Sequence, residues 1–230
     1  MKYALVTGAN KGIGYEIARQ LGKKGFFVFL GARDHERGTI ALKHYTKEGL
    51  EGAFVQIDVA NEASVAAAIQ EMTSRTGHLD VLINNAGILP NGSTPLTETP
   101  PIDAVDTLHT NALGTLWVTQ ACLPLLNPGS RVILVSSGGG AILNGVSGFA
   151  PMYSVSKTTM NAIGMHLSRE LSAQHIPVNV VDPGWVRTDM GGNSAGRSVE
   201  QGADTPVWLA TEADPELTGK FWYDRKERSW

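Results

Sequence analysis

The sequence has little cysteine, since Cys122 is the only one among its 230 residues. One cysteine excludes an intrachain disulfide and any metal site built from several thiolates. The six histidines are scattered without the close, repeated spacing that metal ligands usually show. We therefore predict that no metal takes part in the function.

Strong charge and long apolar runs are also missing. The formal net charge is −3, and the basic residues are scattered, so no basic surface is expected that would hold a nucleic acid. No apolar run approaches membrane-spanning length, and no charged leader followed by a hydrophobic stretch precedes the first strand pattern. These absences predict a soluble, cytoplasmic protein that binds neither nucleic acid nor membrane.

Short apolar segments alternate with amphipathic ones along the whole chain, which is typical of a parallel α/β sheet. Strand patterns occupy residues 3–6, 26–30, 53–57, 81–83, 131–135, 177–181 and 220–223. Helical patterns follow the first glycine-rich loop and occupy 62–76, 109–126, 152–174 and 200–210. We predict a single domain over residues 1–230, a doubly wound (Rossmann) sheet of about seven mostly parallel strands with helices on both faces.

The first strand delivers the chain into a glycine-rich loop with the sequence Thr7-Gly8-Ala9-Asn10-Lys11-Gly12-Ile13-Gly14. Glycines between a strand and a helix let the backbone approach a pyrophosphate, whose charge the helix N-terminus stabilises. The spacing Gly-x-x-x-Gly-x-Gly differs from the usual Gly-x-Gly-x-x-Gly fingerprint, and such a loop alone could be structural. We predict dinucleotide contacts from Gly8, Asn10, Lys11, Gly12, Ile13 and Gly14.

The residues after the second strand indicate which dinucleotide binds. An NAD site usually has an acidic residue here for the ribose 2′-hydroxyl, whereas this chain has Arg33. Arg33 together with Lys11 could hold a 2′-phosphate, which favours NADP(H) over NAD. Alternatively, Asp34 caps the next helix and Arg33 is a solvated loop residue.

Polar residues follow other strands at the carboxyl edge of the expected sheet, where such folds bind their ligands. Asp58 and Val59 come after the third strand, and Asp58 could accept a hydrogen bond from the adenine amino group. Asn84-Asn85-Ala86-Gly87 follows the fourth strand, and Ser136-Ser137 follows the fifth. Residues 191–198, rich in Gly, Asn and Ser, are expected to form a mobile lid.

Tyr153 and Lys157 stand four positions apart in a helical pattern and so share one helix face. An ammonium about 5 Å from a phenol, at an effective dielectric of about 20, favours phenolate by roughly 3 kcal/mol, or about two pKa units. Such a tyrosine could exchange protons near neutral pH. An isolated pair of this kind can also be only a packed ring beside a snorkelling amine.

Taken together, these residues resemble the short-chain dehydrogenase/reductase family over nearly the whole chain. The shared motifs are Thr7 to Gly14, Asn84 to Gly87, Asn111, Ser137, Tyr153 to Lys157, and Pro183-Gly184. Within the family, the chain is most similar to the carbonyl reductases, in Ala32-Arg33-Asp34, in residues 183–190 and in residues 202–207.

The resemblance implies that Tyr153 donates a proton to a substrate carbonyl oxygen while NADPH delivers hydride to the carbon. Lys157 would lower the pKa of Tyr153 and hold the nicotinamide ribose, and Ser137 would hydrogen-bond the carbonyl. Asn111 would hold a water on the proton path. Asn85, Val186 and Thr188 would line the cofactor cleft. The implied substrate is a small-molecule carbonyl or alcohol, and many relatives form homodimers or homotetramers through helices like those at 109–126 and 152–174.

Several points stay open at this level. Ser137 and Tyr153 are 16 positions apart, a few more than in most family members and far fewer than in animal carbonyl reductases. Ser136 is the rival for the serine role, since adjacent strand residues face opposite ways. Two other functions remain, a dehydrogenase for one biosynthetic hydroxy compound and a non-catalytic NADP-binding regulator. The expected pocket wall consists of Ile142, Leu143, Asn144, Phe149, Met152, Trp185 and Met190, the last four of which could equally be core.

Overall fold

The computed structural model of the protein describes residues 1–143, 145–146 and 149–230. One sheet of eight strands runs through it in the order β3-β2-β1-β4-β5-β6-β7-β8. Its strands are β1 (Lys2–Thr7), β2 (Phe26–Ala32), β3 (Gly52–Gln56), β4 (Leu79–Asn84), β5 (Leu126–Val135), β6 (Val178–Val181), β7 (Phe221–Tyr223) and β8 (Lys226–Arg228). All neighbours pair in parallel except β7 and β8, which form an antiparallel hairpin. The predicted doubly wound α/β sheet is therefore confirmed, with one more strand than the approximate count.

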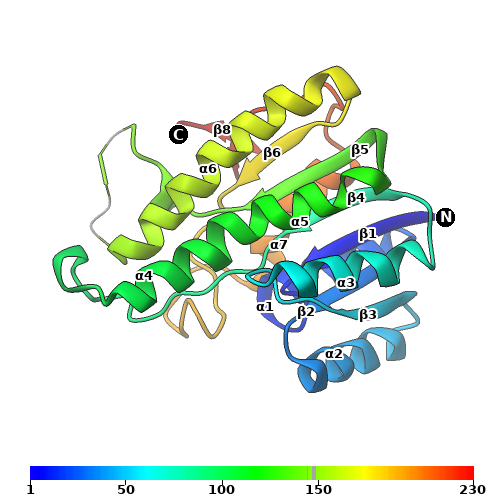
Figure 1. The fold of residues 1–230 in the computed structure, drawn as a ribbon, viewed down its shortest axis with the longest axis horizontal. Helices are drawn as coiled ribbons and strands as arrows, with labels where there is room; N and C mark the ends of the chain where they lie inside the picture. Colours follow the sequence, from blue (N-terminus) through cyan, green and yellow to red (C-terminus); the bar gives the residue numbers. More distant parts are fainter. Residues whose placement is uncertain (144, 147–148) are drawn as a thin grey trace.

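Seven α-helices accompany the sheet in the described residues: α1 (Gly12–Lys23), α2 (His35–Lys47), α3 (Glu62–Thr73), α4 (Pro101–Leu108), α5 (Gly114–Cys122), α6 (Pro151–Leu171) and α7 (Val199–Thr211). Figure 1 shows α3, α5 and α6 in front of the sheet and α1 and α7 behind it. The core divides accordingly into two layers. One holds Met72, Val118 and Leu167 against the strands, and the other holds Leu21, Tyr45 and Val207.

The helix predicted over residues 109–126 is divided in the structure. A π-helical turn, His109–Leu113, links α4 to α5, and a 3-10 turn, Leu123–Leu125, follows α5. β5 then begins at Leu126, five residues earlier than its apolar pattern predicts, because the exposed residues Asn127, Pro128 and Gly129 interrupt that pattern inside the strand. π-turns of this kind are rare and occur often at functional sites.

Side chains cap the starts of α2 and α3. Asp34 Oδ1 accepts from the backbone nitrogen of Arg37 at 2.8 Å, and Asn61 Oδ1 accepts from that of Ser64 at 3.0 Å. Asp34 is thus the N-cap of α2, which is the role that the alternative interpretation of Arg33 and Asp34 gave it. Of the helices in the described part of the chain, none is long and apolar enough to cross a membrane.

Candidate active site

A cleft of about 610 Å³ lies along the carboxyl edge of the sheet. The strand order reverses between β1 and β4, which is where doubly wound folds bind their ligands. Of the residues predicted to bind a cofactor, all but one line this cleft: Gly8, Asn10, Lys11, Gly12, Ile13, Gly14, Arg33, Asp58, Val59, Asn85, Tyr153, Lys157 and Thr188. The structure therefore brings together segments that are up to 180 positions apart in the sequence.

Val186 is the exception. Its side chain is only 3% exposed and packs beside Gly202 of α7, where an added Cβ would lie 2.8 Å from a Val186 methyl carbon. The side chain is therefore turned toward α7, and the expectation that Val186 lines the cofactor cleft stays a prediction. Its neighbour Thr188 does line the cleft.

The glycine loop is held in place by Asn85, which follows β4. The Asn85 side-chain amide donates to the carbonyl oxygen of Thr7 at 2.9 Å, and the Thr7 hydroxyl accepts from the backbone nitrogen of Asn85 at 3.0 Å. A Cβ on Gly14 would lie 2.3 Å from the carbonyl oxygen of Gly8 and 2.4 Å from the Asn85 amide nitrogen. Only glycine fits at position 14, so the loop can fold tightly over the start of α1.

The outer end of the cleft is basic. Arg33 is exposed there, and Arg37 of α2 lines the same space. Arg37 was not predicted from the sequence. Its position in the first turn of the helix that Asp34 caps is the signal that could have placed it beside Arg33. Lys11, expected to bind a phosphate with Arg33, is paired instead with Asp189, the Lys11 Nζ to Asp189 Oδ2 distance being 2.5 Å. Lys11 and Asp189 thus join the glycine loop to the segment after β6.

Asn111 is fully buried in the π-helical turn. Its Oδ1 accepts from the backbone nitrogen of Ile88 at 2.8 Å, and its Nδ2 donates to the Ile88 carbonyl at 2.9 Å and to the Ser156 hydroxyl at 2.9 Å. One side chain therefore fixes the exit of β4 against α6. Gly87 lies between Asn111 and Lys157, since an added Cβ there would be 3.2 Å from Asn111 Oδ1 and 3.7 Å from Lys157 Nζ.

Tyr153 and Lys157 share the inward face of α6 in its first two turns. Lys157 is 3% exposed, its Nζ lies 5.6 Å from the centroid of the Tyr153 ring, and it donates to the Val135 carbonyl oxygen at 2.9 Å. The lysine is thus anchored to the end of β5, directly below the tyrosine. This geometry is the one that the four-residue spacing predicts.

The protonation of the pair differs from the sequence-based expectation. Burial raises the pKa of Tyr153 to about 12, while a hydrogen bond with Ser137 lowers it in part and the charge of Asp182 raises it. Burial lowers the pKa of Lys157 to about 7. The expected lowering of the Tyr153 pKa is therefore wrong for the protein by itself, because desolvation is the largest cause of both shifts and disfavours the charged form of each group.

The two candidate serines at the end of β5 have different partners. Ser136 is buried and its hydroxyl donates to Asn161 Oδ1 at 2.6 Å. Ser137 is half-buried and hydrogen-bonds to Tyr153. Its hydroxyl also accepts from the backbone nitrogen of Gly139 at 3.1 Å. The structure thus places Ser137, rather than Ser136, beside the phenol.

Most of the large apolar side chains expected in the pocket wall are exposed, and Met190 among them lines the cleft. Ile142 is 54% exposed, Leu143 71%, Phe149 68%, Trp185 59% and Met190 45%. Phe149, Trp185 and Met190 are therefore not core residues, which resolves the alternative left open by the sequence. Met152 is half-buried, and Asn144 lies outside the described residues.

The segment 191–198, expected as a lid, is hydrogen-bonded on both sides. Arg187 Nη1 donates to the Ala195 carbonyl at 3.0 Å, and Trp185 Nε1 donates to the Gly191 carbonyl at 2.8 Å. Arg197 donates to Asp224 at 2.7 Å in the turn between β7 and β8. The segment thus connects the cleft to the C-terminal hairpin.

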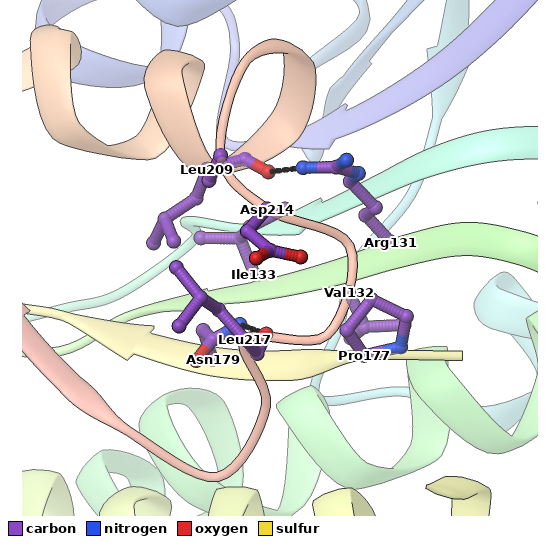
Figure 2. Close-up of a pocket in the computed structure, with 9 residues that line it drawn as sticks. Arg131, Val132, Ile133, Pro177, Asn179, Leu209, Asp214 and Leu217 are labelled. Atoms are coloured by element: carbon purple, nitrogen blue, oxygen red, sulfur yellow. Dashed lines mark hydrogen bonds between the residues drawn. The ribbon is translucent and has the colours of Figure 1, made fainter. Parts of the chain in front are cut away.

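A second, small hollow lies toward the amino ends of β5 and β6 and is too narrow to admit water. Figure 2 shows Arg131 Nη1 donating to the Leu209 carbonyl at 2.6 Å and Asn179 Nδ2 donating to the Leu217 carbonyl at 2.6 Å. Asp214 Oδ1 accepts from the backbone nitrogen of Glu216 at 2.9 Å. The hollow therefore offers no ligand site. Within the described residues, no group of histidine, cysteine and acidic side chains could hold a metal ion.

Comparison with known proteins agrees with this geometry. Residues 2–197 match the family model described as short chain dehydrogenase. The chain is 36% identical to carbonyl reductase 1 (NADPH) from Mus musculus, over 99% of this chain and 98% of the mouse protein. That alignment runs over 275 positions, more than the 230 residues of this chain, so the mouse protein has segments that this chain lacks.

Solved structures with the same fold cover the chain fully. The carbonyl reductase Sniffer of D. melanogaster superposes with a TM-score of 0.90, at 28% identity, covering all of both chains. The NADPH-bound carbonyl reductase from chicken fatty liver has a TM-score of 0.88 at 26% identity, covering 100% of this chain and 99% of the chicken protein.

Proposed function

Since the chain belongs to the short chain dehydrogenase family, we propose that it is an NADPH-dependent carbonyl reductase. The substrate is a small or medium ketone, aldehyde or quinone, and alcohol oxidation is the reverse reaction. The observation that carries the proposal is that Tyr153 and Lys157 line the dinucleotide-type cleft together, with Ser137 hydrogen-bonded to Tyr153. The curated relatives of the chain include proteins named as NADPH carbonyl reductases.

The cleft fits an NADP(H) molecule. At position 14 a side chain would collide with Gly8, so the loop offers bare backbone to a pyrophosphate, and Arg33 and Arg37 form a basic outer end for a 2′-phosphate. Asp58 and Val59 line the space between them, beside the adenine. Bound there, the cofactor supplies the hydride that reduces the carbonyl carbon.

Tyr153 is the proton donor to the carbonyl oxygen. A pKa raised to about 12 keeps the phenol protonated at neutral pH, which is the form that reduction requires. Ser137 hydrogen-bonds the same oxygen and stabilises the charge that develops there. Hydride on carbon and the Tyr153 proton on oxygen together give the neutral alcohol.

Lys157 and Asn111 act behind the tyrosine. Lys157, when protonated, stabilises the phenolate that remains after proton donation and reaches the ribose side of the cleft. Because both polar ends of the Asn111 side chain are engaged with Ile88 and Ser156, a water on the proton path would bind the Asn111 backbone carbonyl, at the lone pair left beside its hydrogen bond from the Thr115 hydroxyl at 3.2 Å. In this proposal, the π-turn directs that carbonyl.

The exposed side chains beside the site favour substrates with an apolar body. Ile142, Leu143, Trp185 and Met190 are large, apolar and 45% or more exposed. Burying such side chains against a ligand contributes about 25 cal/mol per Å² of apolar area removed from water. We therefore expect KM to fall as the apolar area of the substrate increases.

A spectrophotometric assay tests the function. Loss of NADPH absorbance is followed with a panel of ketones, aldehydes and quinones, for the wild type and Tyr153→Phe. We expect Tyr153→Phe to lower kcat by at least about 100-fold, the usual contribution of a general acid, with NADPH binding retained. Tyr3→Phe, at the amino end of β1 on the opposite edge of the sheet, is the control and should keep full turnover. Turnover by Tyr153→Phe near the wild-type rate would refute the assignment.

Cofactor choice has its own test. Arg33→Ala should raise the KM for NADPH by about tenfold and leave that for NADH nearly unchanged, because only NADPH carries the 2′-phosphate. Arg75→Ala, just after the end of α3, is the control, since Arg75 pairs there with the exposed Glu71. Equal effects of Arg33→Ala on the two nucleotides would remove Arg33 from the phosphate site.

Assembly as a homodimer or homotetramer is also part of the proposal. The interface would be formed by α4 and α6. Both helices carry exposed apolar residues, namely Ile102, Val105 and Met165, which support it. Light scattering measures the state directly, and a monomer at micromolar concentration would contradict it.

A further inference from the structure

The C-terminal end of the chain lies against the segment that carries Ser137. The backbone nitrogen of Leu143 donates to the carbonyl oxygen of Trp230 at 2.8 Å. Trp230 in turn stacks on the fully buried Phe221 of β7, with ring centroids 5.4 Å apart and an interplanar angle of 18°. Trp230 is therefore fixed to the sheet and holds the loop that leaves β5.

An ion pair also joins β8 to the residue that follows β6. Arg228, in β8, donates through Nη1 to Oδ2 of Asp182, which is 6% exposed and follows β6. The other oxygen of Asp182 accepts from the backbone nitrogen of Gly184 at 2.8 Å. The guanidinium also lies 5.1 Å from the centroid of the Phe221 ring. The pair thus joins the C-terminal hairpin to the strand end beside the active site.

The ion pair touches the residue directly after Ser137. A Cβ on Gly138 would lie 2.9 Å from Asp182 Oδ2 and 3.2 Å from Arg228 Nη1. Only a glycine backbone can approach the pair so closely, and Gly138 begins the 3-10 turn that Ser137 caps. The position of the Ser137 hydroxyl therefore depends on Arg228 and Asp182 as well as on β5.

We propose that Arg228, together with Trp230, is a positioning element for Ser137, holding its hydroxyl at hydrogen-bond distance from Tyr153. The inference rests on the proposed function, in which Ser137 binds the carbonyl oxygen. Arg228 does not touch the substrate in this arrangement and acts through Gly138. A displacement of about 1 Å in such a group can lower turnover on the order of 100-fold.

Arg228 has a second, electrostatic effect on the same centre. Tyr153 faces Lys157 on its own helix, α6, and Asp182 at the end of β6, while Ser137 from β5 is uncharged. The negative charge of Asp182 raises the pKa of Tyr153, and Arg228 places a positive charge directly on that carboxylate. Without Arg228, the field of Asp182 at the phenol would be stronger.

The first experiment measures the tether without any turnover. Hydrogen exchange is compared in the full chain for the wild type, Arg228→Met and Arg225→Met. Arg225, in the same hairpin, pairs with the exposed Asp204 and is the matched control. We expect Arg228→Met to raise exchange at the backbone nitrogens of Gly139, Gly140 and Leu143 at least about tenfold, and Arg225→Met to leave it unchanged. Equal exchange in all three proteins would overturn the proposal, whatever the enzyme's activity.

The second experiment connects the tether to Ser137. Arg228→Met should lower kcat about tenfold and keep the NADPH dissociation constant within about twofold. In a Ser137→Ala background, Arg228→Met should lower kcat by less than about threefold, because the hydroxyl that Arg228 positions has already been removed. Fully additive losses would show that Arg228 acts elsewhere.

A pH profile separates positioning from general damage to the fold. Arg228→Met should move the alkaline limb of kcat/KM for carbonyl reduction to higher pH, whereas the double variant Asp182→Asn/Arg228→Met, which removes both charges, should not. An unmoved limb in Arg228→Met would overturn the electrostatic part. Should Arg228→Met fail to fold, Trp230→Ala tests the same tether at the chain end, and unchanged exchange at Leu143 there would overturn the proposal. Activity retained by Tyr153→Phe would refute the proposed function but not the exchange result.

Discussion

Lys157 gives the fold a stability that depends on pH in a calculable way. Burial lowers its pKa from 10.5 to about 7, so above about pH 7 the folded protein holds the lysine neutral while the unfolded chain keeps it charged. The unfolded state then binds more protons, and the free energy of unfolding rises with pH. The penalty for burying the lysine is complete below about pH 7 and has disappeared above about pH 10.5.

The magnitude follows from the two pKa values. Between pH 7 and 8.5, linkage gives an increase of about 1.6 kcal/mol in the free energy of unfolding. Urea denaturation of the wild type and Lys157→Met, each at both pH values without added nucleotide, measures it. Lys157→Met cannot titrate at this position, and the contributions of all other groups cancel in the comparison. The free energy of unfolding of the wild type, minus that of Lys157→Met, should therefore rise by about 1.6 kcal/mol between pH 7 and 8.5. Parallel pH dependence of the two proteins would show that Lys157 stays charged in the fold and would refute the reasoning.

Three further predictions follow from the cleft and the core. Gly14→Ala should weaken NADPH binding at least about tenfold in a fluorescence titration, since its Cβ would overlap the Gly8 carbonyl, whereas Gly77→Ala, where an added Cβ meets nothing within 4 Å, should bind normally. Asp189→Asn should tighten NADPH binding about threefold and leave NADH unchanged, because Lys11 is released to a 2′-phosphate; weaker NADPH binding would contradict this. Burial raises the pKa of the Cys122 thiol to about 12, so a thiol reagent should label Cys122 only after denaturation, and rapid labelling of the folded protein would be inconsistent with its position.

The alternation of apolar and amphipathic segments was enough to predict the doubly wound sheet. Parallel strands buried on both faces, such as β1 and β4, read as short continuous apolar runs. β8 could not be predicted in this way, because Lys226, Glu227 and Arg228 show no apolar alternation. The strand is held by the Trp230 ring on Phe221 and by Arg228 on Asp182, and the second of these contacts joins residues 46 positions apart, beyond the reach of a local pattern.

The candidate site was predictable in its residues and less so in its energetics. Spacing alone places Tyr153 over Lys157, since helix geometry fixes that relation. The pKa of Tyr153 was not predictable, because it depends on how deeply the two groups are buried, which the sequence does not show. The Lys11 to Asp189 pair spans 178 positions and joins two loops whose meeting no local pattern predicts.

The opposite pKa directions of Tyr153 and Lys157 bear on the direction of catalysis. A phenol with a pKa near 12 retains its proton at neutral pH, so it is ready to reduce a carbonyl, whereas alcohol oxidation needs the phenolate. Deprotonation of Tyr153 is helped by a protonated Lys157, yet the lysine loses its proton near pH 7. Burial thus raises the pKa of Tyr153 and lowers that of Lys157, which keeps Tyr153 a neutral acid at neutral pH. Reduction should therefore dominate near pH 7, and oxidation of the product alcohol should accelerate steadily as the pH is raised above about 8; an oxidation rate that is highest at neutral pH would mean that another group accepts the proton.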